Sequence, residues 1–301
     1  MRKNLTAKQL IERDWKFPTG HRLGYQGFVS EMKAKRQEQL EAWSLRRPMA
    51  NFEVNDYLAA YQNYPPEEFS EPYSVPDVAY ATHLNSMQKK YLSRFKNVRR
   101  AWSRVLRFLP EAMHSGDRLR VLEMSTAHGA TLEVLRHFGH DVVGNDFSND
   151  GLSSRVGGGT PLRQVNSDIP VENVNEADWP YKPIIDSLGL DVRLFDAGKL
   201  PYPFDAAEFD VVLCFDALEH YCHPKDWMKI VDEFVRISKK TVVVRINPIQ
   251  RHLIPDQAYT PYVQKFYQAM LEYSKSGFRC IVTEAESNQP LYFKLMKISD
   301  K

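Results

Sequence analysis

Short apolar runs alternate with longer helical patterns from residue 119 to the end of the chain. That rhythm is typical of a parallel sheet whose strands are joined by crossover helices. The predicted strands are 119–124, 141–145, 191–195, 209–215 and 241–246, and the predicted helices lie near 130–138, within 216–237 and at 259–276. Two further β-rich runs, FRCIVTEA and PLYFKLMKI, flank a turn-like ESNQ and predict a closing antiparallel hairpin. The expected fold is therefore α/β, with a seven-stranded, mostly parallel sheet.

The N-terminal part has a different character. Residues 26–46 lack proline and are rich in helix-forming residues. The segment 64–76 holds four prolines and is expected to be a rigid, mostly extended connector. A long helix is predicted over 81–109, because apolar residues recur there at three- and four-residue steps and Pro110 follows.

These patterns divide the chain in two. We expect a helical N-terminal extension or cap at 1–114 and the α/β domain at 115–301. A Gly- and Asn-containing stretch at 151–190 indicates an insertion between the second and third strands, and long loops of this kind tend to serve function. Residues 1–118 carry 20 Lys and Arg against 13 Asp and Glu, so this part is basic although the whole chain has a net charge of +2.

Composition limits the class of protein. With 43% hydrophobic and 26% charged residues, the chain resembles an average globular protein. No stretch approaches the roughly 18–20 apolar residues of a transmembrane helix, and the charged N-terminus lacks the apolar core of a signal peptide. The three cysteines form no CxxC pair. A cytoplasmic location is therefore expected.

The first predicted strand runs into VLEMSTAHGATLEVL. Glu123 is followed at every second position by the small residues Ser125, Ala127 and Gly129, as suits a tight strand-to-helix turn whose amides approach a ligand. Ser125 and Ala127 carry a Cβ where glycine would take positive φ freely, so a differently shaped turn and weaker ligand binding are open alternatives. Asp146 ends the second strand about 20 residues later, where an acid can bind ribose hydroxyls in nicotinamide-binding folds as well as in others.

The third strand leads into LFDAGKLPYPFDAAEFDVVLCFDALEHY. Taken with the loop and the closing hairpin, this stretch resembles the class I S-adenosylmethionine (SAM)-dependent methyltransferases, over roughly residues 115–300. The resemblance implies a Rossmann-like sheet with SAM as cofactor. Ser125 and Ala127 depart from the family pattern, which has glycines at those positions. An NAD-dependent oxidoreductase is disfavoured because no GxGxxG follows the first strand.

The resemblance also implies which residues bind the cofactor. They are Glu123, Met124, Ser125, Ala127, Gly129, Asp146, Phe147, Asp196, Ala197 and Phe215. Glu123 would accept from the amino acid end of SAM, and Asp146 would hold the ribose hydroxyls. Phe147 would lie against the adenine, and Asp196 would accept from its amino group with the Ala197 amide near the ring. Phe215 and Asp216 would flank the sulfonium.

Asp216, Glu219 and His220 follow the fourth strand at i, i+3 and i+4, which on a helix places them on one side. Histidine, with an unperturbed pKa near 6.5, suits a general base. The alternative is a purely structural role, in which Glu219 and His220 only cap and pack the turn. A third interpretation makes the three residues metal ligands, because they resemble the Glu-x-x-Glu-His of quinone-biosynthesis and small-RNA 2′-O-methyltransferases; His223 and His252 would then supply further nitrogen.

The predicted helix over 81–109 has a run of basic residues between 89 and 107 and no acid among them. Such a run is either the solvated face of a packed helix or a surface for phosphates. The expected function is methyl transfer from SAM to a hydroxyl of a small or medium-sized metabolite, such as a sugar or a natural product, assisted by His220 or Asp216. The alternatives are an RNA 2′-O-methyltransferase with a metal at Asp216, Glu219 and His220, and a non-catalytic scaffold or sensor.

Overall fold

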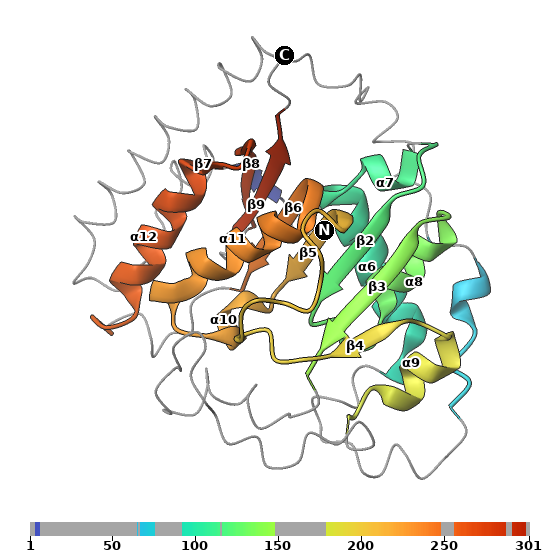
Figure 1. Ribbon diagram of the computed structural model, residues 1–301. Coiled ribbons are helices and arrows are strands. Elements are labelled where there is room, and N and C mark those ends of the chain that lie inside the picture. Colours follow the sequence, from blue (N-terminus) through green and yellow to red (C-terminus); the bar gives the residue numbers. More distant parts are fainter. Residues whose placement is uncertain are drawn as a thin grey trace.

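A mixed sheet runs through the computed structural model, which describes residues 4–6, 65, 67–75, 92–114, 116–147, 179–247, 256–286 and 291–298. The strands are β1 (Asn4–Thr6), β2 (Arg120–Met124), β3 (Asp141–Asp146), β4 (Val192–Leu194), β5 (Phe209–Phe215), β6 (Ser238–Ile246), β7 (Ser274–Lys275), β8 (Phe278–Glu286) and β9 (Leu291–Lys297). They are ordered β1-β8-β9-β6-β5-β2-β3-β4, and β7 pairs with β8 (Figure 1).

Five neighbouring strands, from β4 through β3, β2 and β5 to β6, run parallel. The hairpin of β8 and β9 continues the sheet antiparallel to β6. These seven strands confirm the predicted mostly parallel sheet with its closing hairpin. The short strands β1 and β7, both antiparallel to β8, were not predicted.

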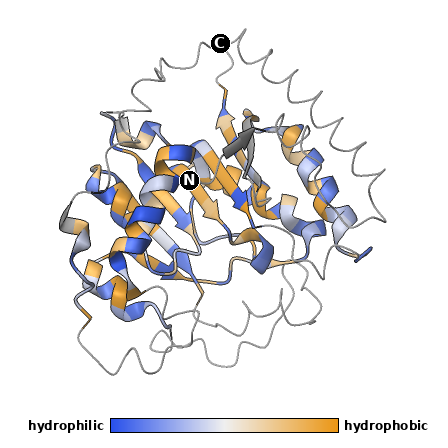
Figure 2. Ribbon diagram, turned by 180° about the vertical axis from the view of Figure 1, so that it is seen from behind, coloured by the Kyte–Doolittle hydropathy of each residue, from blue (hydrophilic) through white to orange (hydrophobic). Residues whose placement is uncertain are grey.

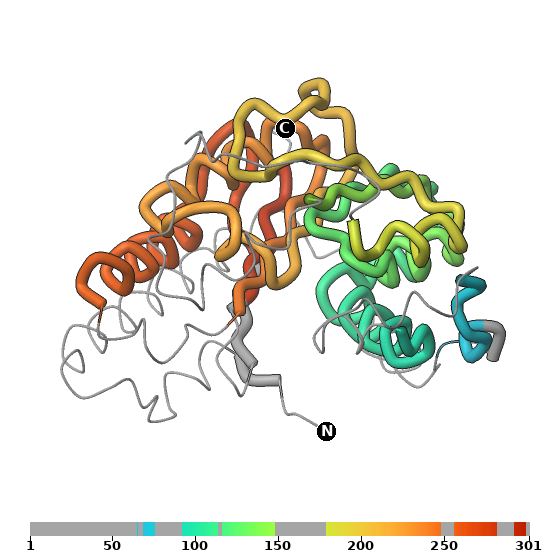
Figure 3. Tube along the Cα trace, turned by 90° about the horizontal axis from the view of Figure 1, so that it is seen from below, coloured from blue at the N-terminus to red at the C-terminus, as the bar shows by residue number. Residues whose placement is uncertain are grey.

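Helices cover both faces of the sheet. They are η2 (Glu67–Ser70), α6 (Arg94–Phe108), α7 (Glu111–His114), α8 (Ala130–His137), α9 (Lys182–Leu188), α10 (Leu218–Tyr221), η6 (Pro224–Asp226), α11 (Trp227–Ile237) and α12 (Thr260–Leu271). α6 and α8 share a core with one face, whereas α11 and α12 share a core with the other, and Figure 3 shows the two groups apart.

The two cores follow from the alternation of side chains along a strand. In β2, Val121 belongs to the core under α6 and α8, whereas Leu122 and Met124 belong to the core under α11 and α12. Because both faces are covered, the parallel strands are hydrophobic along their length, as their colour in Figure 2 shows. Glu123 therefore points to the same side as Val121, toward α6 and α8.

Two predicted helix ends are wrong. α6 begins at Arg94, and Ser93 before it is extended, with φ −86° and ψ 92°, so a single helix over 81–109 does not form. α12 ends at Leu271 instead of continuing to 276. Ser276 and Gly277 both have positive φ, and such a pair makes the tight turn of a hairpin between β7 and β8.

α6 packs on the sheet in the same core as α8. Its residues Val98, Trp102 and Val105 are buried against α8 and the sheet, and Arg94 forms an ion pair with Glu133 of α8. Apolar side chains at three- and four-residue steps predicted this buried face correctly. The division of the chain at residue 114 stays a prediction.

Several predictions fall on parts of the chain that the structure does not describe. These are the helix at 26–46, the basic residues Lys89 and Lys90, residues 151–178 of the insertion, and His252. Of the proline-rich connector, residues 67–70 form η2 in place of extended chain. No helix in the described part of the chain is long and apolar enough to span a bilayer.

Candidate active site

The loop after β2 has a backbone that normally requires glycine. Ser125, Ala127 and Gly129 have φ values of 54°, 50° and 75°, all in the left-handed region. For Ser125 and Ala127 this conformation costs about 1–2 kcal/mol each. At Gly129 a Cβ would lie 2.6 Å from Leu190 Cδ1, so this position also needs glycine for space. The loop therefore takes positive φ at all three positions, although two of them are not glycine.

Neighbouring elements hold this strained loop. Ser125 Oγ lies 2.8 Å from the Tyr221 hydroxyl of α10. The Thr126 amide donates to the carbonyl of Asn145 in β3 at 2.8 Å. Gly144 makes the close approach possible, because a Cβ there would lie 2.6 Å from Thr126 Oγ1. The loop is thus fixed against both β3 and α10.

Glu123 lies next to the last residue of β2 and has a buried carboxyl group. Burial raises the pKa of Glu123 to about 8, against the lowering effects of Thr131 and Arg104, while Asp146 raises it further. Among the described residues, its Oε2 has no hydrogen-bond partner. A buried carboxyl oxygen that lacks a hydrogen-bond partner, at the carboxyl end of a strand, is suited to accept from a ligand's ammonium group.

Asp146, the last residue of β3, connects this strand to the loop that follows β2. Its Oδ2 accepts from the Ala127 amide and from the Trp179 indole Nε1, both at 3.1 Å. Its Oδ1 accepts from the Phe147 amide at 2.8 Å. The carboxylate is therefore oriented at the carboxyl edge of the sheet, beside the left-handed loop.

The remaining predicted cofactor residues differ in their surroundings. Asp196 Oδ1 accepts from the Gly198 amide at 2.9 Å, and the Tyr202 hydroxyl donates to the Ala197 carbonyl at 2.8 Å. These contacts shape the turn after β4 at the same edge. The side chains of Met124 and Phe215, by contrast, are buried in the two cores, so Met124 presents only its backbone to that edge.

Asp216 is not on a helix with Glu219 and His220. It has a φ of 58°, and α10 begins only at Leu218, so the expectation of three side chains on one helix face is wrong. Its carboxylate lies between two guanidinium groups: Oδ2 accepts from Arg104 of α6 and Oδ1 from Arg245 of β6. The two oxygens of Asp216 are thus both occupied by cations.

Glu219 and His220 form a separate pair. Glu219 is buried, its Oε1 accepts from the Asn247 amide at 3.2 Å, and burial raises its pKa. His220 Nε2 lies 3.9 Å from Glu219 Oε1, and the His220 side chain is 34% exposed. In the described part of the chain His220 Nδ1 has no hydrogen-bond partner. His220 therefore combines partial exposure with a neighbouring carboxyl group.

The metal interpretation gains no geometric support. Within the described ranges, no three His, Cys, Asp or Glu side chains gather in a group that could hold a metal ion. Both ring nitrogens of His223 contact backbone groups: Nε2 lies 2.7 Å from the Ala258 carbonyl, and Nδ1 accepts from the Lys225 amide.

Four residues of this edge were not predicted as site residues: Arg104, Trp179, Tyr221 and Arg245. Arg245 could have been recognised as a site residue, because it is a charged residue inside the apolar strand TVVVRI and such a residue needs a buried partner. Arg104 was hidden in a run of basic residues. Trp179 and Tyr221 gave no local signal, since their partners Asp146 and Ser125 are distant in sequence.

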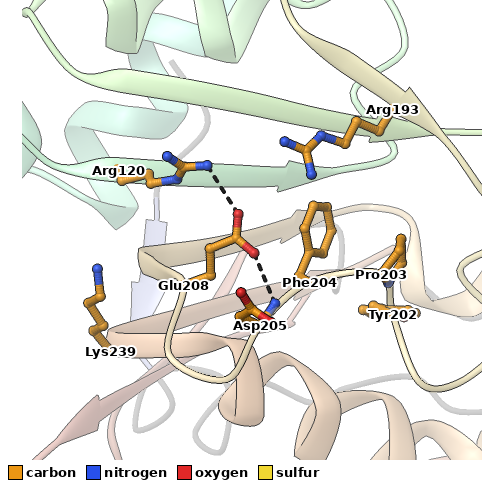
Figure 4. A pocket seen from close by; sticks show the side chains of 8 residues that line it. All are labelled: Arg120, Arg193, Tyr202, Pro203, Phe204, Asp205, Glu208 and Lys239. Carbon is orange, nitrogen blue, oxygen red and sulfur yellow. Dashed lines mark hydrogen bonds and ion pairs between the residues drawn. The ribbon is translucent and has the colours of Figure 1, made fainter.

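A hollow of about 730 Å³ lies at a different place, lined by Arg120, Arg193, Tyr202, Pro203, Phe204, Asp205, Glu208 and Lys239 (Figure 4). Arg120 begins β2 and Glu208 precedes β5, so this hollow is at the amino ends of those strands. Parallel sheets bind ligands beyond the carboxyl ends. Its charges also pair with one another, as in the Arg120–Glu208 contact of 3.0 Å. We therefore place the active site at the opposite edge.

Solved structures match this chain at low sequence identity. No curated protein matches the sequence. Among solved structures, a protein from Pyrococcus horikoshii is 17% identical, with a TM-score of 0.42, over 65% of this chain and 90% of that one. The magnesium protoporphyrin IX methyltransferase from Synechocystis, solved with bound SAM, is 13% identical, with a TM-score of 0.41, over 83% of this chain and 100% of that one.

A family model described as a methyltransferase domain matches residues 94–247. The match begins at the first residue of α6 and ends just after β6, so it includes the left-handed loop, Asp146, Asp216 and His220. This family takes its methyl group from SAM. The chain therefore belongs to the methyltransferase domain family, and it is a SAM-dependent methyltransferase with a Rossmann-like fold.

Proposed function

We propose that the protein transfers the methyl group of SAM to a hydroxyl oxygen of a small or medium-sized metabolite, such as a sugar or a natural product, with His220 as the general base. The main support for the position of SAM is Oε2 of Glu123, which is buried without a hydrogen-bond partner among the described residues and belongs to the strand that leads into the left-handed loop. A cytoplasmic location belongs to the same proposal.

Each cofactor residue has a proposed task. Glu123 would accept from the ammonium group of the methionine part, and the amides of residues 125–129 would face the methionine and ribose. Asp146, already oriented by the Ala127 amide, would accept from the ribose hydroxyls. Phe147 would pack on the adenine. When bound, SAM supplies an electrophilic methyl group on a positively charged sulfur.

The turn after β4 and the end of β5 would complete the cofactor site. Asp196 would accept from the adenine amino group, with the Ala197 amide close to the ring. The Phe215 ring, which lies under the Arg104 guanidinium at 5.7 Å, would form the wall nearest the sulfonium. An aromatic face suits a cationic ligand.

His220 is the better of the two candidate bases. Both oxygens of Asp216 accept from guanidinium groups, so a proton taken up by Asp216 would weaken two ion pairs. His220 is partly exposed, and Glu219 3.9 Å away would stabilise the imidazolium that forms when the acceptor hydroxyl gives up its proton. We therefore assign proton removal to His220 and an anchoring task to Asp216.

One observation favours a second candidate, methyl transfer to an RNA 2′-hydroxyl. Lys96, Arg99 and Arg100 are exposed on α6, and a phosphate backbone could lie along them. This candidate predicts binding that weakens steeply with salt. A neutral metabolite predicts almost no salt dependence.

Isotopically labelled SAM tests the proposal. The protein would be incubated with a metabolite extract and, separately, with RNA, and the products would be analysed by mass spectrometry. The expected result is label in a small metabolite, on an oxygen atom. Label on nitrogen, on carbon or in RNA would contradict the proposal, and binding of SAM without any labelled product would favour a scaffold or sensor.

A further inference from the structure

We propose that Tyr221 is a positioning residue for methyl transfer, because its side chain ties the loop after β2 to α10, the helix that carries His220. This role rests on the proposed function, in which the loop faces SAM and His220 is the general base. Tyr221 would connect the two, so that the base is held at a fixed place relative to the methyl group.

α10 is a single helical turn, Leu218–Tyr221. The residues next to it are not helical: Ala217 has a φ of −135° and Cys222 a φ of −161°. One turn is unstable by itself, because the first turn of a helix fixes several residues for few hydrogen bonds. The position of His220 therefore depends on the contacts that α10 and its flanking residues make with other elements.

Two contacts hold α10 toward β6 and α11. The Glu219 carboxyl group accepts from the amide of Asn247, which directly follows β6, at 3.2 Å. The Trp227 indole at the start of α11 donates to the Cys222 carbonyl at 2.9 Å. Neither contact involves the loop after β2.

Tyr221 supplies the contact with that loop. Its hydroxyl lies 2.8 Å from Ser125 Oγ and 3.8 Å from Cys214 Sγ. Cys214 pairs with Met124, the last residue of β2, so the hydroxyl lies where the strand passes into the loop. Burial raises the pKa of Tyr221 well above its ordinary value, which keeps the hydroxyl protonated and neutral. A buried hydroxyl requires a hydrogen-bond partner, and Ser125 provides one.

Ser125 makes this link in a strained backbone conformation. Its φ of 54° is one that glycine would take without strain. Glycine, however, has no hydroxyl and could not bond Tyr221. The hydrogen bond thus offsets strain in the loop and, at the same time, joins the loop to α10.

The link has a consequence for the reaction rate. Tyr221 directly follows His220, so a shift of the Tyr221 backbone also moves the base. In methyl transfer the reacting atoms must be aligned, and a misplacement of about 1 Å can cost about a hundredfold in rate. Loss of the hydrogen bond should therefore slow the reaction, whereas SAM affinity should change far less, because the amides of the loop remain.

Two variants remove the hydrogen bond from opposite ends. Tyr221→Phe keeps the ring and loses only the hydroxyl, while Ser125→Gly loses Oγ and relieves the positive φ. At saturating SAM, each should slow the transfer of isotopic label to a metabolite extract by about tenfold. Their affinity for S-adenosylhomocysteine (SAH), measured by calorimetric titration, should stay close to that of the wild type.

Folding stability separates positioning from a purely structural role. Ser125→Gly should unfold at about the same denaturant concentration as the wild type, because relief of the strain offsets the lost hydrogen bond. It should nevertheless transfer label slowly, and a wild-type rate would overturn the inference. Where Tyr221→Phe does not fold, Ser125→Gly carries this test alone.

Tyr273→Phe is the matched control. Tyr273 is also buried, and its hydroxyl donates to Asp232 of α11 at 2.8 Å. Loss of this hydroxyl should leave the rate of label transfer unchanged. An equal loss of rate in Tyr273→Phe and Tyr221→Phe would overturn the inference, because any buried tyrosine hydroxyl would then have the same effect.

The double variant tests whether Ser125 and Tyr221 act through one bond. It should be no slower than the slower single variant, because each change breaks the same contact. Losses that multiply would overturn the inference. If the wild type binds no SAH, or binds it and transfers no label, the proposed function fails and this role fails with it. Label transfer by the wild type, with normal rates in both single variants, would overturn the role of Tyr221 alone.

Discussion

Two loops at the carboxyl edge hold non-glycine residues in the left-handed conformation, and they are stabilised differently. The loop after β2, with Ser125 and Ala127, is fixed by hydrogen bonds to β3 and α10. Asp216 after β5 donates its amide to the Arg245 carbonyl of β6 at 2.7 Å and, in addition, its carboxylate forms ion pairs with α6 and β6. We call Glu123, residues 125–129 and Asp146, where we propose that SAM binds, the cofactor side. We call Asp216, His220, Arg104 and Arg245, which we place on the proposed side of the methyl acceptor, the acceptor side. The loop of the cofactor side is held by hydrogen bonds, whereas the acceptor side adds ion pairs to its backbone hydrogen bond.

The largest expected effect is a loss of turnover when a residue of the acceptor side is changed and the cofactor side is left intact. His220→Ala should lower kcat by about a hundredfold or more, because general-base catalysis contributes roughly 10²–10⁴-fold, while SAM affinity stays unchanged. His223→Ala is the matched control, since His223 bonds the Ala258 carbonyl and should leave both quantities unchanged. Normal turnover in His220→Ala would remove His220 from the mechanism.

A smaller effect concerns the charge of Glu123. Its pKa is about 8 in the folded protein against an ordinary value of 4.5, so the carboxyl group is mostly protonated at pH 7. Binding of an ammonium group favours the carboxylate and releases the proton. SAM affinity should therefore rise with pH up to about 8, by at most about tenfold per pH unit.

Glu123→Gln isolates this contribution, because the amino group of SAM titrates identically in both proteins. The variant should lack the rise and bind SAM more weakly at pH 8. Folding stability has the opposite sign: the native state holds a proton that the unfolded state loses between pH 4.5 and about 8, so this residue reduces wild-type stability as pH increases through that window. Parallel pH profiles for wild type and Glu123→Gln, in calorimetric titration and in denaturant unfolding, would refute this account.

The smallest effect tests the strained backbone. Ala127→Gly should increase the free energy of unfolding by about 1 kcal/mol, because glycine takes the positive φ without strain. Ala207→Gly, at a φ of 52° outside the site, should stabilise the protein similarly and leave SAM affinity unchanged. Denaturant unfolding measures both. A loss of stability in Ala127→Gly would show that the residue is not held in the left-handed region.

The sequence predicted the tight turn after β2 and the position of Asp146 well, because their signals are local. Small residues at every second position indicated the turn, and Asp146 followed at the expected spacing. The sheet was predicted for the same reason, since buried parallel strands are continuous apolar runs. The end of α12 was missed because the SG turn at 276–277 lies directly behind a helical pattern.

The acceptor side could not be predicted in the same way. The spacing of Asp216, Glu219 and His220 fits a helix, but the left-handed Asp216 breaks that periodicity. Its partners Arg104 and Arg245 lie 112 and 29 positions away in the sequence. Ion pairs over such separations depend on how the elements pack, and no short motif encodes them.

The account rests on the cofactor side holding SAM, and titration of the full-length protein with SAH tests this most directly. Wild type should bind SAH, Asp146→Ala should weaken the binding at least tenfold, and Asp141→Ala, at the other end of the same strand, should bind like wild type. Absence of binding to wild type, or equal affinity in the Asp146→Ala and Asp141→Ala variants, would contradict the account.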